Sequence, residues 1–217
     1  MSQSIFITGI GTSVGNTLVS AIVAEALEAD YWKPIQAGIE NGTDTEWVHS
    51  SVSNSKTRIH PESYKLQFPA SPHLAAQKEG ISITLDKIYS DYTKIISYQN
   101  DPGGCLVIEG AGGLMVPLNQ NEFVIDMVQK LGCKLIIVSR NYLGSINHSL
   151  LTALAATQRG IPVCGWIFND HFLNYEHDIV AWSGYSLLGA IPFTSHPDKA
   201  FVRQQAALLR AQLVNII

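Results

Sequence analysis

A short apolar strand, a glycine-rich turn and the start of a helix follow one another in SIFITGIGTSVGNT, residues 4–17. This order is typical of a phosphate-binding loop, in which glycines let backbone N–H groups converge on phosphate oxygens at the positive end of a helix. The hydroxyl of Thr17 is then expected to meet a magnesium ion. The stretch therefore predicts a phosphate site at a strand-to-helix turn.

Two features of this loop depart from a Walker A loop. Asn16 stands where such a loop has the lysine that bridges the β- and γ-phosphates, and its neutral amide supplies neither the charge nor the reach. Five residues rather than four separate Gly9 from Gly15. Taken alone, the loop is open to a second interpretation, as a purely structural turn, and the rest of the chain must decide.

Short β-branched apolar runs alternate with segments of helical spacing along the rest of the chain. This alternation predicts an α/β fold, a doubly wound and mostly parallel sheet with helices on both faces. The predicted strands are residues 4–8, 31–33, 105–109, 135–139, 163–168 and 186–191. The predicted helices are residues 17–29, 85–99, 123–131, 145–159 and 198–214, with a short extra helix that Ser71 and Pro72 open and that runs to Gln77. Residues 34–69 carry no clear pattern, and long loops of this kind usually serve a site.

Composition excludes several classes of protein. Of the 217 residues, 46% are hydrophobic and 15% charged, which is enough apolar material for a full core. The 14 Lys and Arg against 18 Asp and Glu give a net charge of −4, and no stretch is basic enough to follow a nucleic acid backbone. The apolar runs fall well short of the roughly 20 residues that cross a bilayer, and the N-terminus lacks the pattern of a signal peptide. We therefore expect a cytoplasmic protein that binds neither nucleic acid nor membrane, with Cys105, Cys133 and Cys164 as buried free thiols.

A second motif, CLVIEGAGG at residues 105–113, places a carboxylate at the predicted end of an apolar strand. In a doubly wound sheet that end lies beside the phosphate loop. Glu109 is then expected to join Thr17 around Mg²⁺. The alternative for Glu109 is a carboxylate that caps local amides at the end of the strand.

With these two motifs, the chain resembles the dethiobiotin synthetase family of the P-loop NTPase superfamily, nearly from end to end. The most specific landmarks are EGAGG with a downstream Pro-Leu at 117–118, and LGSINH at residues 143–148. The other landmarks are the loop at 9–17, Lys33-Pro34 with Gly38, Asp44, Ser71-Pro72-His73, Asn169-Asp170 and residues 189–192. A chance match of all these motifs at these separations is negligible.

The resemblance implies one P-loop NTPase-like domain over residues 1–217 and a cyclo-ligase of biotin biosynthesis. In that family 7,8-diaminononanoate, CO2 or bicarbonate, and ATP give dethiobiotin, ADP and phosphate, with Mg²⁺ as the cofactor. A substrate amine takes up CO2 as a carbamate, the γ-phosphate activates it as a mixed anhydride, and the second amine closes the cyclic urea. The protein must then mainly position anions and neutralise them.

The family pattern also implies the site residues. Mg²⁺ is assigned to Thr17, Asp44 and Glu109. The nucleotide is assigned to Gly11, Thr12, Ser13, Val14, Gly15, Asn16, Thr17, Glu109, Asn169 and Pro192. The diamine is assigned to Lys33, Ala37, Gly112, Gly144, Ser145 and Asn147. Lys33 and Thr12 are the expected catalytic residues, and Lys33 is expected to contact the carbamate and the γ-phosphate.

Several of these residues have a structural alternative. Lys33 alone would be a solvated lysine at the end of a strand, and Asp44 alone would be the N-cap of a helix around residues 45–52. Ser145 would be an ordinary N-cap of the helix that begins near it, and this role is compatible with substrate binding by the free amides there. The histidines at 148, 171, 177 and 196 show no metal-site spacing and are expected at the surface or at helix ends.

The resemblance has two further implications. In the family, the helix end at residues 144–147 serves the substrate of the partner subunit, which implies a homodimer. Asn169 and the region of Pro192 resemble the adenine pocket of the family, in which an acidic residue follows the proline. Thr194-Ser195-His196 stands there in this chain, so the selectivity for the nucleotide base stays open.

The first loop differs from the family at Ser13, where an acid is usual, and at Asn16. Loss of the lysine charge is expected to reduce the reaction rate, because one phosphate clamp stabilises the transition state by a few kcal/mol. An alternative function is therefore a catalytically impaired paralogue that only binds nucleotide or diamine. A ParA/MinD-like ATPase is set aside, because Ile10-Gly11-Thr12 stands where those proteins carry a signature lysine.

Overall fold

The computed structural model describes residues 3–98, 104–170 and 172–216. In these residues β1 (Gln3–Gly9) lies at the centre of a seven-stranded sheet with the order β4-β2-β6-β1-β7-β8-β9. The other six strands are β2 (Asp30–Trp32), β4 (Ile59–His60), β6 (Cys105–Gly113), β7 (Lys134–Ser139), β8 (Val163–Asn169) and β9 (Leu187–Ile191). Every pairing within this sheet is parallel, so the carboxyl ends of the strands meet at one edge. The predicted fold class is confirmed.

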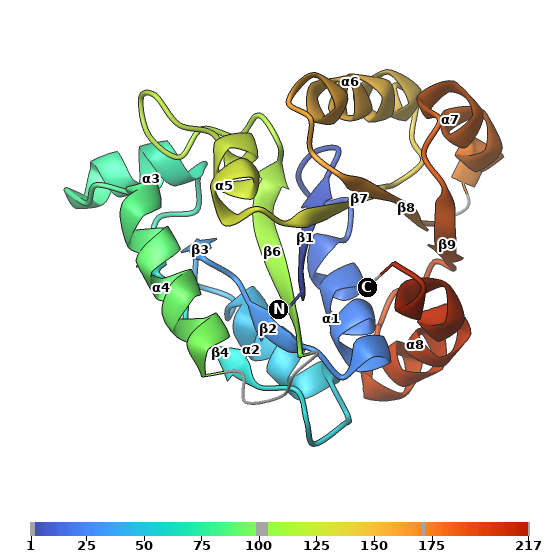
Figure 1. Cartoon of the computed structure of the whole chain (residues 1–217), viewed down its shortest axis with the longest axis horizontal. Helices are drawn as coiled ribbons and strands as arrows, with labels where there is room; N and C mark the ends of the chain where they lie inside the picture. The colour runs from blue at the N-terminus through green and yellow to red at the C-terminus, as the bar shows by residue number, and fades with distance from the viewer. Residues whose placement is uncertain (1–2, 99–103, 171, 217) are drawn as a thin grey trace.

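Helices cover both faces of this sheet (Figure 1). α1 (Asn16–Leu27), α2 (Asp44–Ser51) and α8 (Lys199–Val214) pack together on one face. The other face carries α4 (Leu85–Ser97), α5 (Val124–Leu131), α6 (Ser145–Gln158) and α7 (Glu176–Ser183), with contacts between α4 and α5 and between α6 and α7. The central strands are buried from both sides, which explains why they read as continuous apolar runs rather than alternating ones.

The stretch that the sequence left unassigned contains short elements. Besides α2 and β4, it holds β3 (Ile35–Ala37) and β5 (Tyr64–Leu66), which pair in a separate two-stranded sheet. α3 (Pro72–Glu79) follows this small sheet, contacts both of its strands and begins at the predicted Pro72. A 3₁₀ turn (Phe172–Asn174) and α7 were also not predicted. The predicted helix end at Gln99 lies outside the described residues.

Two structural alternatives and one prediction were wrong. Asp44 is not an N-cap, because Thr43 accepts a hydrogen bond from the Glu46 amide and completes a capping box with the Glu46 side chain. Ser145 is not an N-cap either, since α6 begins after Gly144, whose φ of 103° suits a glycine. Glu109 is not at the tip of its strand, because β6 continues to Gly113.

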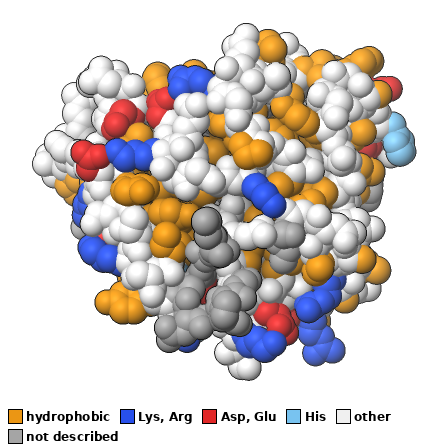
Figure 2. All heavy atoms as spheres, viewed as in Figure 1, with side chains coloured by type: hydrophobic (Ala, Val, Ile, Leu, Met, Phe, Trp, Pro, Cys, Tyr) orange, Lys and Arg blue, Asp and Glu red, His pale blue; other side chains and the backbone are white. Residues whose placement is uncertain are grey.

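The predictions made for the cysteines and the histidines are confirmed in part. The thiols of Cys105 and Cys133 are buried and that of Cys164 is half-buried, and burial raises the pKa of the first two to about 12. The histidines at 148, 177 and 196 are exposed as expected, and His171 lies outside the described residues. Figure 2 shows acidic and basic side chains next to one another on one face rather than in areas of a single sign. In the described part of the chain, no helix is both long and apolar enough to cross a membrane.

Candidate active site

The glycine-rich loop joins β1 to α1 and is held against the end of β8. Gly15, the N-cap of α1, has a φ of 102°, and a Cβ there would lie 2.0 Å from Nδ2 of Asn169. That same Nδ2 donates a hydrogen bond to the carbonyl of Val14 at 3.0 Å. Only glycine fits this position, and Asn169 therefore fixes the shape of the loop.

Asn16 lies at the first position of α1 and ties the loop to the end of β6. Its Nδ2 donates to the carbonyl oxygen of Gly112 at 3.2 Å. Its Oδ1 is buried, and no group in the described part of the chain makes a hydrogen bond to it. The residue at the lysine position therefore binds the protein's own backbone and brings no positive charge to the loop.

Thr17, Asp44 and Glu109 meet beside this loop, as predicted for a metal site. The Thr17 hydroxyl lies 2.8 Å from Oδ1 of Asp44 and 2.9 Å from Oε1 of Glu109, and its single proton serves one of them at a time. Glu109 projects from the interior of β6, and Asp44 opens α2 just after the capping residue. These residues are far apart in the sequence, and they meet because the carboxyl ends of the parallel strands lie at the same edge of the sheet.

Lys33 lies between the two carboxylates. Its Nζ is 2.8 Å from Oδ2 of Asp44 and 2.7 Å from Oε1 of Glu109. Its side chain is 6% exposed and that of Glu109 is 1% exposed, so the solvated-lysine alternative is wrong. Tyr31, which the sequence analysis missed, donates its hydroxyl proton to Oε2 of Glu109 at 2.7 Å.

Thr17, Lys33, Asp44 and Glu109 form what we call the acidic cluster, and their contacts shift the pKa values of its members. Burial disfavours the ammonium of Lys33, but the charges of Glu109 and Asp44 outweigh it and raise the lysine pKa. Burial likewise disfavours the Asp44 carboxylate, but the Lys33 charge and the hydrogen bonds from Lys33 and Thr17 lower its pKa. Burial and the nearby Glu109 carboxylate raise the pKa of Tyr31 well above its ordinary value. At neutral pH Lys33 is therefore protonated and Asp44 is ionised.

The donor set suits a hard divalent cation. Two carboxylates and a hydroxyl are oxygen ligands of the kind that Mg²⁺ takes, usually with phosphate oxygens of a substrate and water completing its shell. The described residues contain no group of three or more His, Cys, Asp or Glu side chains arranged for a metal. A cation held by Thr17, Asp44 and Glu109 would therefore depend on a phosphate ligand for part of its coordination.

A cavity of about 440 Å³ opens from this cluster. Three of the predicted substrate residues line it, namely Lys33, Ala37 and Gly112, together with Thr12 of the loop and Asp44. Other walls come from the stretch at residues 69–72. The phosphate loop, the acidic cluster and this open cavity therefore share one edge of the sheet.

The other predicted substrate residues lie elsewhere. Gly144 and Asn147, at the start of α6, are exposed, and Ser145 is buried, with its Oγ accepting a hydrogen bond from the Tyr142 amide at 3.2 Å. None of them lines the 440 Å³ cavity. Within one chain, the two halves of the predicted substrate site are not brought together.

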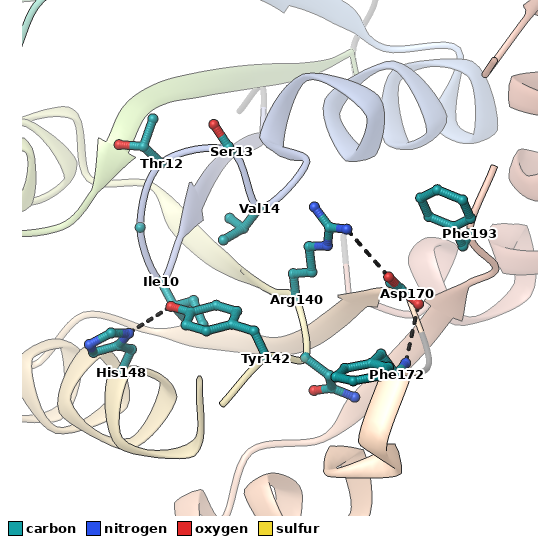
Figure 3. Close-up of a pocket in the computed structure, with 12 residues that line it drawn as sticks. Ile10, Thr12, Ser13, Val14, Arg140, Tyr142, His148, Asp170, Phe172 and Phe193 are labelled. Carbon is teal, nitrogen blue, oxygen red and sulfur yellow. Dashed lines mark hydrogen bonds and ion pairs between the residues drawn. The ribbon is translucent and has the colours of Figure 1, made fainter. Parts of the chain in front are cut away.

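A larger cavity of about 790 Å³ lies on the other side of the same loop (Figure 3). Its walls are Ile10, Gly11, Thr12, Ser13 and Val14 from the loop, with Arg140, Asn141, Tyr142, His148, Asp170, Phe172 and Phe193. Phe193 follows Pro192 and Asp170 follows Asn169, and both Pro192 and Asn169 were expected to bind the nucleotide. Arg140 was not predicted, although its place directly after β7, at the carboxyl edge of the sheet, is a signal that would have found it.

Known proteins resemble the chain over its whole length. A sequence profile described as an AAA domain matches residues 3–199. The ATP-dependent dethiobiotin synthetase BioD of Christiangramia forsetii is 44% identical over 217 residues, which is 100% of both chains. The protein of that name from Cytophaga hutchinsonii is 45% identical over 184 residues, covering 84% of this chain and 85% of its own.

Solved structures show the same fold at low identity. MinD in the MinC:MinD complex of Aquifex aeolicus gives a TM-score of 0.59 at 12% identity, covering 99% of this chain and 93% of its own. A ParA family ATPase from Chlorobium tepidum gives 0.55 at 11% identity, covering 99% and 91%. At such identities these neighbours establish the architecture alone.

Proposed function

The chain belongs to the ATP-dependent dethiobiotin synthetase family of P-loop enzymes, and we propose that it carboxylates 7,8-diaminononanoate with CO2 and closes the ring to dethiobiotin. One observation supports this proposal above the others. Lys33 and Thr12 line the same cavity as Ala37 and Gly112, and Lys33 contacts the two carboxylates beside the phosphate loop. A diamine in this cavity would therefore lie next to the phosphates of a nucleotide on the loop.

The residues of the cavity suit an anionic intermediate. In the proposed reaction one amine adds to CO2 and loses a proton, so a neutral end of the diamine becomes a carbamate. A carbamate oxygen then takes the γ-phosphoryl group, ADP leaves, and the second amine displaces phosphate from the carbonyl carbon. Lys33 keeps its proton because two carboxylates raise its pKa, so it offers a lasting positive charge to the carbamate and the γ-phosphate. Thr12 is proposed as the loop residue nearest to this transfer.

The phosphate loop and its neighbours are proposed to hold the nucleotide. The amides from Gly11 to Thr17 would cradle the phosphates at the N-terminus of α1. Thr17, Asp44 and Glu109 would hold Mg²⁺, which when bound neutralises charge on the β- and γ-phosphates. Asn169 and Pro192 are proposed to lie near the base, next to the 790 Å³ cavity that their neighbours Asp170 and Phe193 line.

We also propose that the enzyme is a homodimer, in which the α6 N-terminus of one chain completes the diamine site of the other. Gly144, Ser145 and Asn147 lie outside the Lys33 cavity, and the neighbouring Leu143 is 90% exposed. Met115 and Leu151, each more than half exposed, line a hollow of about 290 Å³ together with Thr12. An exposed apolar area that includes a loop residue is suited to a second copy that covers the site.

Leu151→Asp is expected to convert the protein from a dimer to a monomer at micromolar concentration, because it places a charge in this apolar hollow. Light scattering of the two proteins measures the change. Leu208→Asp, at a leucine on α8 that is also more than half exposed, is the matched control and should stay dimeric. A parent protein that is monomeric with and without ATP would contradict the proposed dimer.

The whole chain is proposed to act as a single domain in the cytoplasm, where ATP is available. The alternative, an impaired paralogue that only binds its ligands, has no support among the relatives found. The proposal is tested by incubating the protein with the diamine, ATP, Mg²⁺ and labelled CO2. Label should enter dethiobiotin only when all of them are present, and its absence from the product would contradict the proposed function.

A further inference from the structure

The phosphate loop lacks a cation of its own. Asn16 is neutral, and its amide donates to the Gly112 carbonyl. Lys33 has carboxylate oxygens of Asp44 and Glu109 within 2.8 Å, so its ammonium group is already engaged by two partners. Phosphoryl transfer depends on neutralising negative charge on the transferred group. Besides Lys33 and a bound Mg²⁺, further positive charge from another element would therefore strengthen phosphate binding at this loop.

Arg140 is a cation that faces the same cavity as the phosphate loop. It follows β7 directly and lines the 790 Å³ cavity together with all five loop residues from Ile10 to Val14. Among the described residues that line this cavity, it is the only arginine or lysine. Figure 3 shows its guanidinium between Val14 of the loop and Asp170.

The contacts of Arg140 position it without burying its charge. Nη2 lies 3.5 Å from Oδ2 of Asp170, and the arginine side chain is 42% exposed. Asp170 is itself oriented, because its Oδ1 accepts a hydrogen bond from the Phe172 amide at 3.1 Å. A guanidinium has five N–H donors in a planar fork, and this long contact engages one corner of it. The remaining donors suit the paired oxygens of a phosphate.

We propose that Arg140 supplies to the β- and γ-phosphates of ATP the positive charge that Asn16 does not, with Asp170 as its positioning residue. The inference rests on the proposed function for the presence of ATP at the loop. It assigns a phosphate-binding residue that directly follows β7 and lies outside both the loop and the acidic cluster. The missing lysine is then compensated from the neighbouring strand.

The first test measures nucleotide binding alone. Arg140→Gln should weaken ATP binding at least about tenfold by calorimetry, and AMP binding, which involves no β- or γ-phosphate, by less than about threefold. Arg140→Lys should keep most of the ATP affinity, since it retains the charge. Arg203→Gln, at an exposed arginine on α8, is the control and should leave both affinities unchanged. Equal losses for ATP and AMP, or no loss for ATP, would overturn the inference.

The second test asks whether Arg140 performs the role of the missing lysine. In the Arg140→Gln protein, the further change Asn16→Lys should restore ATP affinity at least about tenfold, whereas in the parent it should add less than about threefold. Equal gains in both backgrounds would mean that the two sites act independently and would overturn the proposal. Because both tests use nucleotide without diamine, a protein that binds ATP in this way but makes no dethiobiotin would contradict only the proposed function.

Discussion

Lys33→Met is expected to lower the free energy of unfolding by about 3 to 5 kcal/mol in the absence of Mg²⁺ and nucleotide. Methionine fills a similar volume but carries no charge. The change leaves the carboxylates of Glu109, 1% exposed, and Asp44 facing each other with no cation between them. Removal of one partner from a buried ion pair costs this much because the remaining charge stays desolvated. Denaturant unfolding followed by circular dichroism measures the loss.

Added Mg²⁺ should restore more stability to the Lys33→Met protein than to the parent. In the variant the two carboxylates are open to the ion, whereas in the parent Lys33 occupies both. Lys56→Met is the matched control, because Lys56 pairs with Glu28 at the surface and its side chain is 70% exposed. A Lys33→Met protein as stable as the control, with no response to Mg²⁺, would contradict the account of the acidic cluster.

Glu109→Gln is expected to reduce the rate of ATP-dependent dethiobiotin formation at least about 100-fold, equivalent to about 2.7 kcal/mol. Glu109 receives contacts from Thr17, Lys33 and Tyr31, so it connects the loop to the cavity. Glutamine keeps the volume and one acceptor but loses the charge that would hold Mg²⁺. The substitution therefore weakens a proposed Mg²⁺ ligand and, at the same time, one of the two carboxylates that contact Lys33.

Calorimetry separates this effect from a loss of structure. In the Glu109→Gln protein, ATP affinity should no longer rise when Mg²⁺ is added, while the circular dichroism spectrum stays that of the parent. Glu40→Gln, at an exposed glutamate outside the cluster, should leave the rate and the magnesium response intact. An unchanged magnesium response in Glu109→Gln would make Glu109 a structural residue only.

The long elements and the meeting of Thr17 with Glu109 could be predicted from the sequence for physical reasons. Strands buried on both faces appear as uninterrupted apolar runs, and the glycines at 9, 11 and 15 mark the loop. Because parallel strands end at a shared edge, Thr17 and Glu109 were expected to meet, and their side chains lie 2.9 Å apart. The order of motifs along the chain was therefore enough to bring Thr17 and Glu109 together, whereas Asp44 and Lys33 were assigned by the family resemblance.

The parts that the sequence did not reveal depend on tertiary contacts. β3, β4 and β5 are two or three residues long, too short for any periodicity, and exist because they pair with neighbours distant in sequence. The N-cap of α2 is a different case, because Thr43 and Glu46 have the local spacing of a capping box, a signal that the sequence did contain.

Individual site residues were missed for a similar reason. Tyr31 reads as a core aromatic of a strand, and only the fold shows its hydroxyl at Glu109. Arg140 is a lone cation after a strand, and its role depends on a loop 123 or more residues earlier in the chain. The positions of these two side chains are set by the neighbouring strands β2 and β7, not by any local motif.

The most direct test of the account follows oxygen from CO2. If the γ-phosphoryl group is transferred to a carbamate oxygen, ring closure must release that oxygen with the phosphate. With CO2 labelled by ¹⁸O, the diamine and unlabelled ATP, mass spectrometry of initial products should find one ¹⁸O atom in each phosphate formed and one in the urea of dethiobiotin. Dethiobiotin formed alongside phosphate that carries no label would contradict a carbamate phosphate and the roles proposed for Lys33 and the phosphate loop.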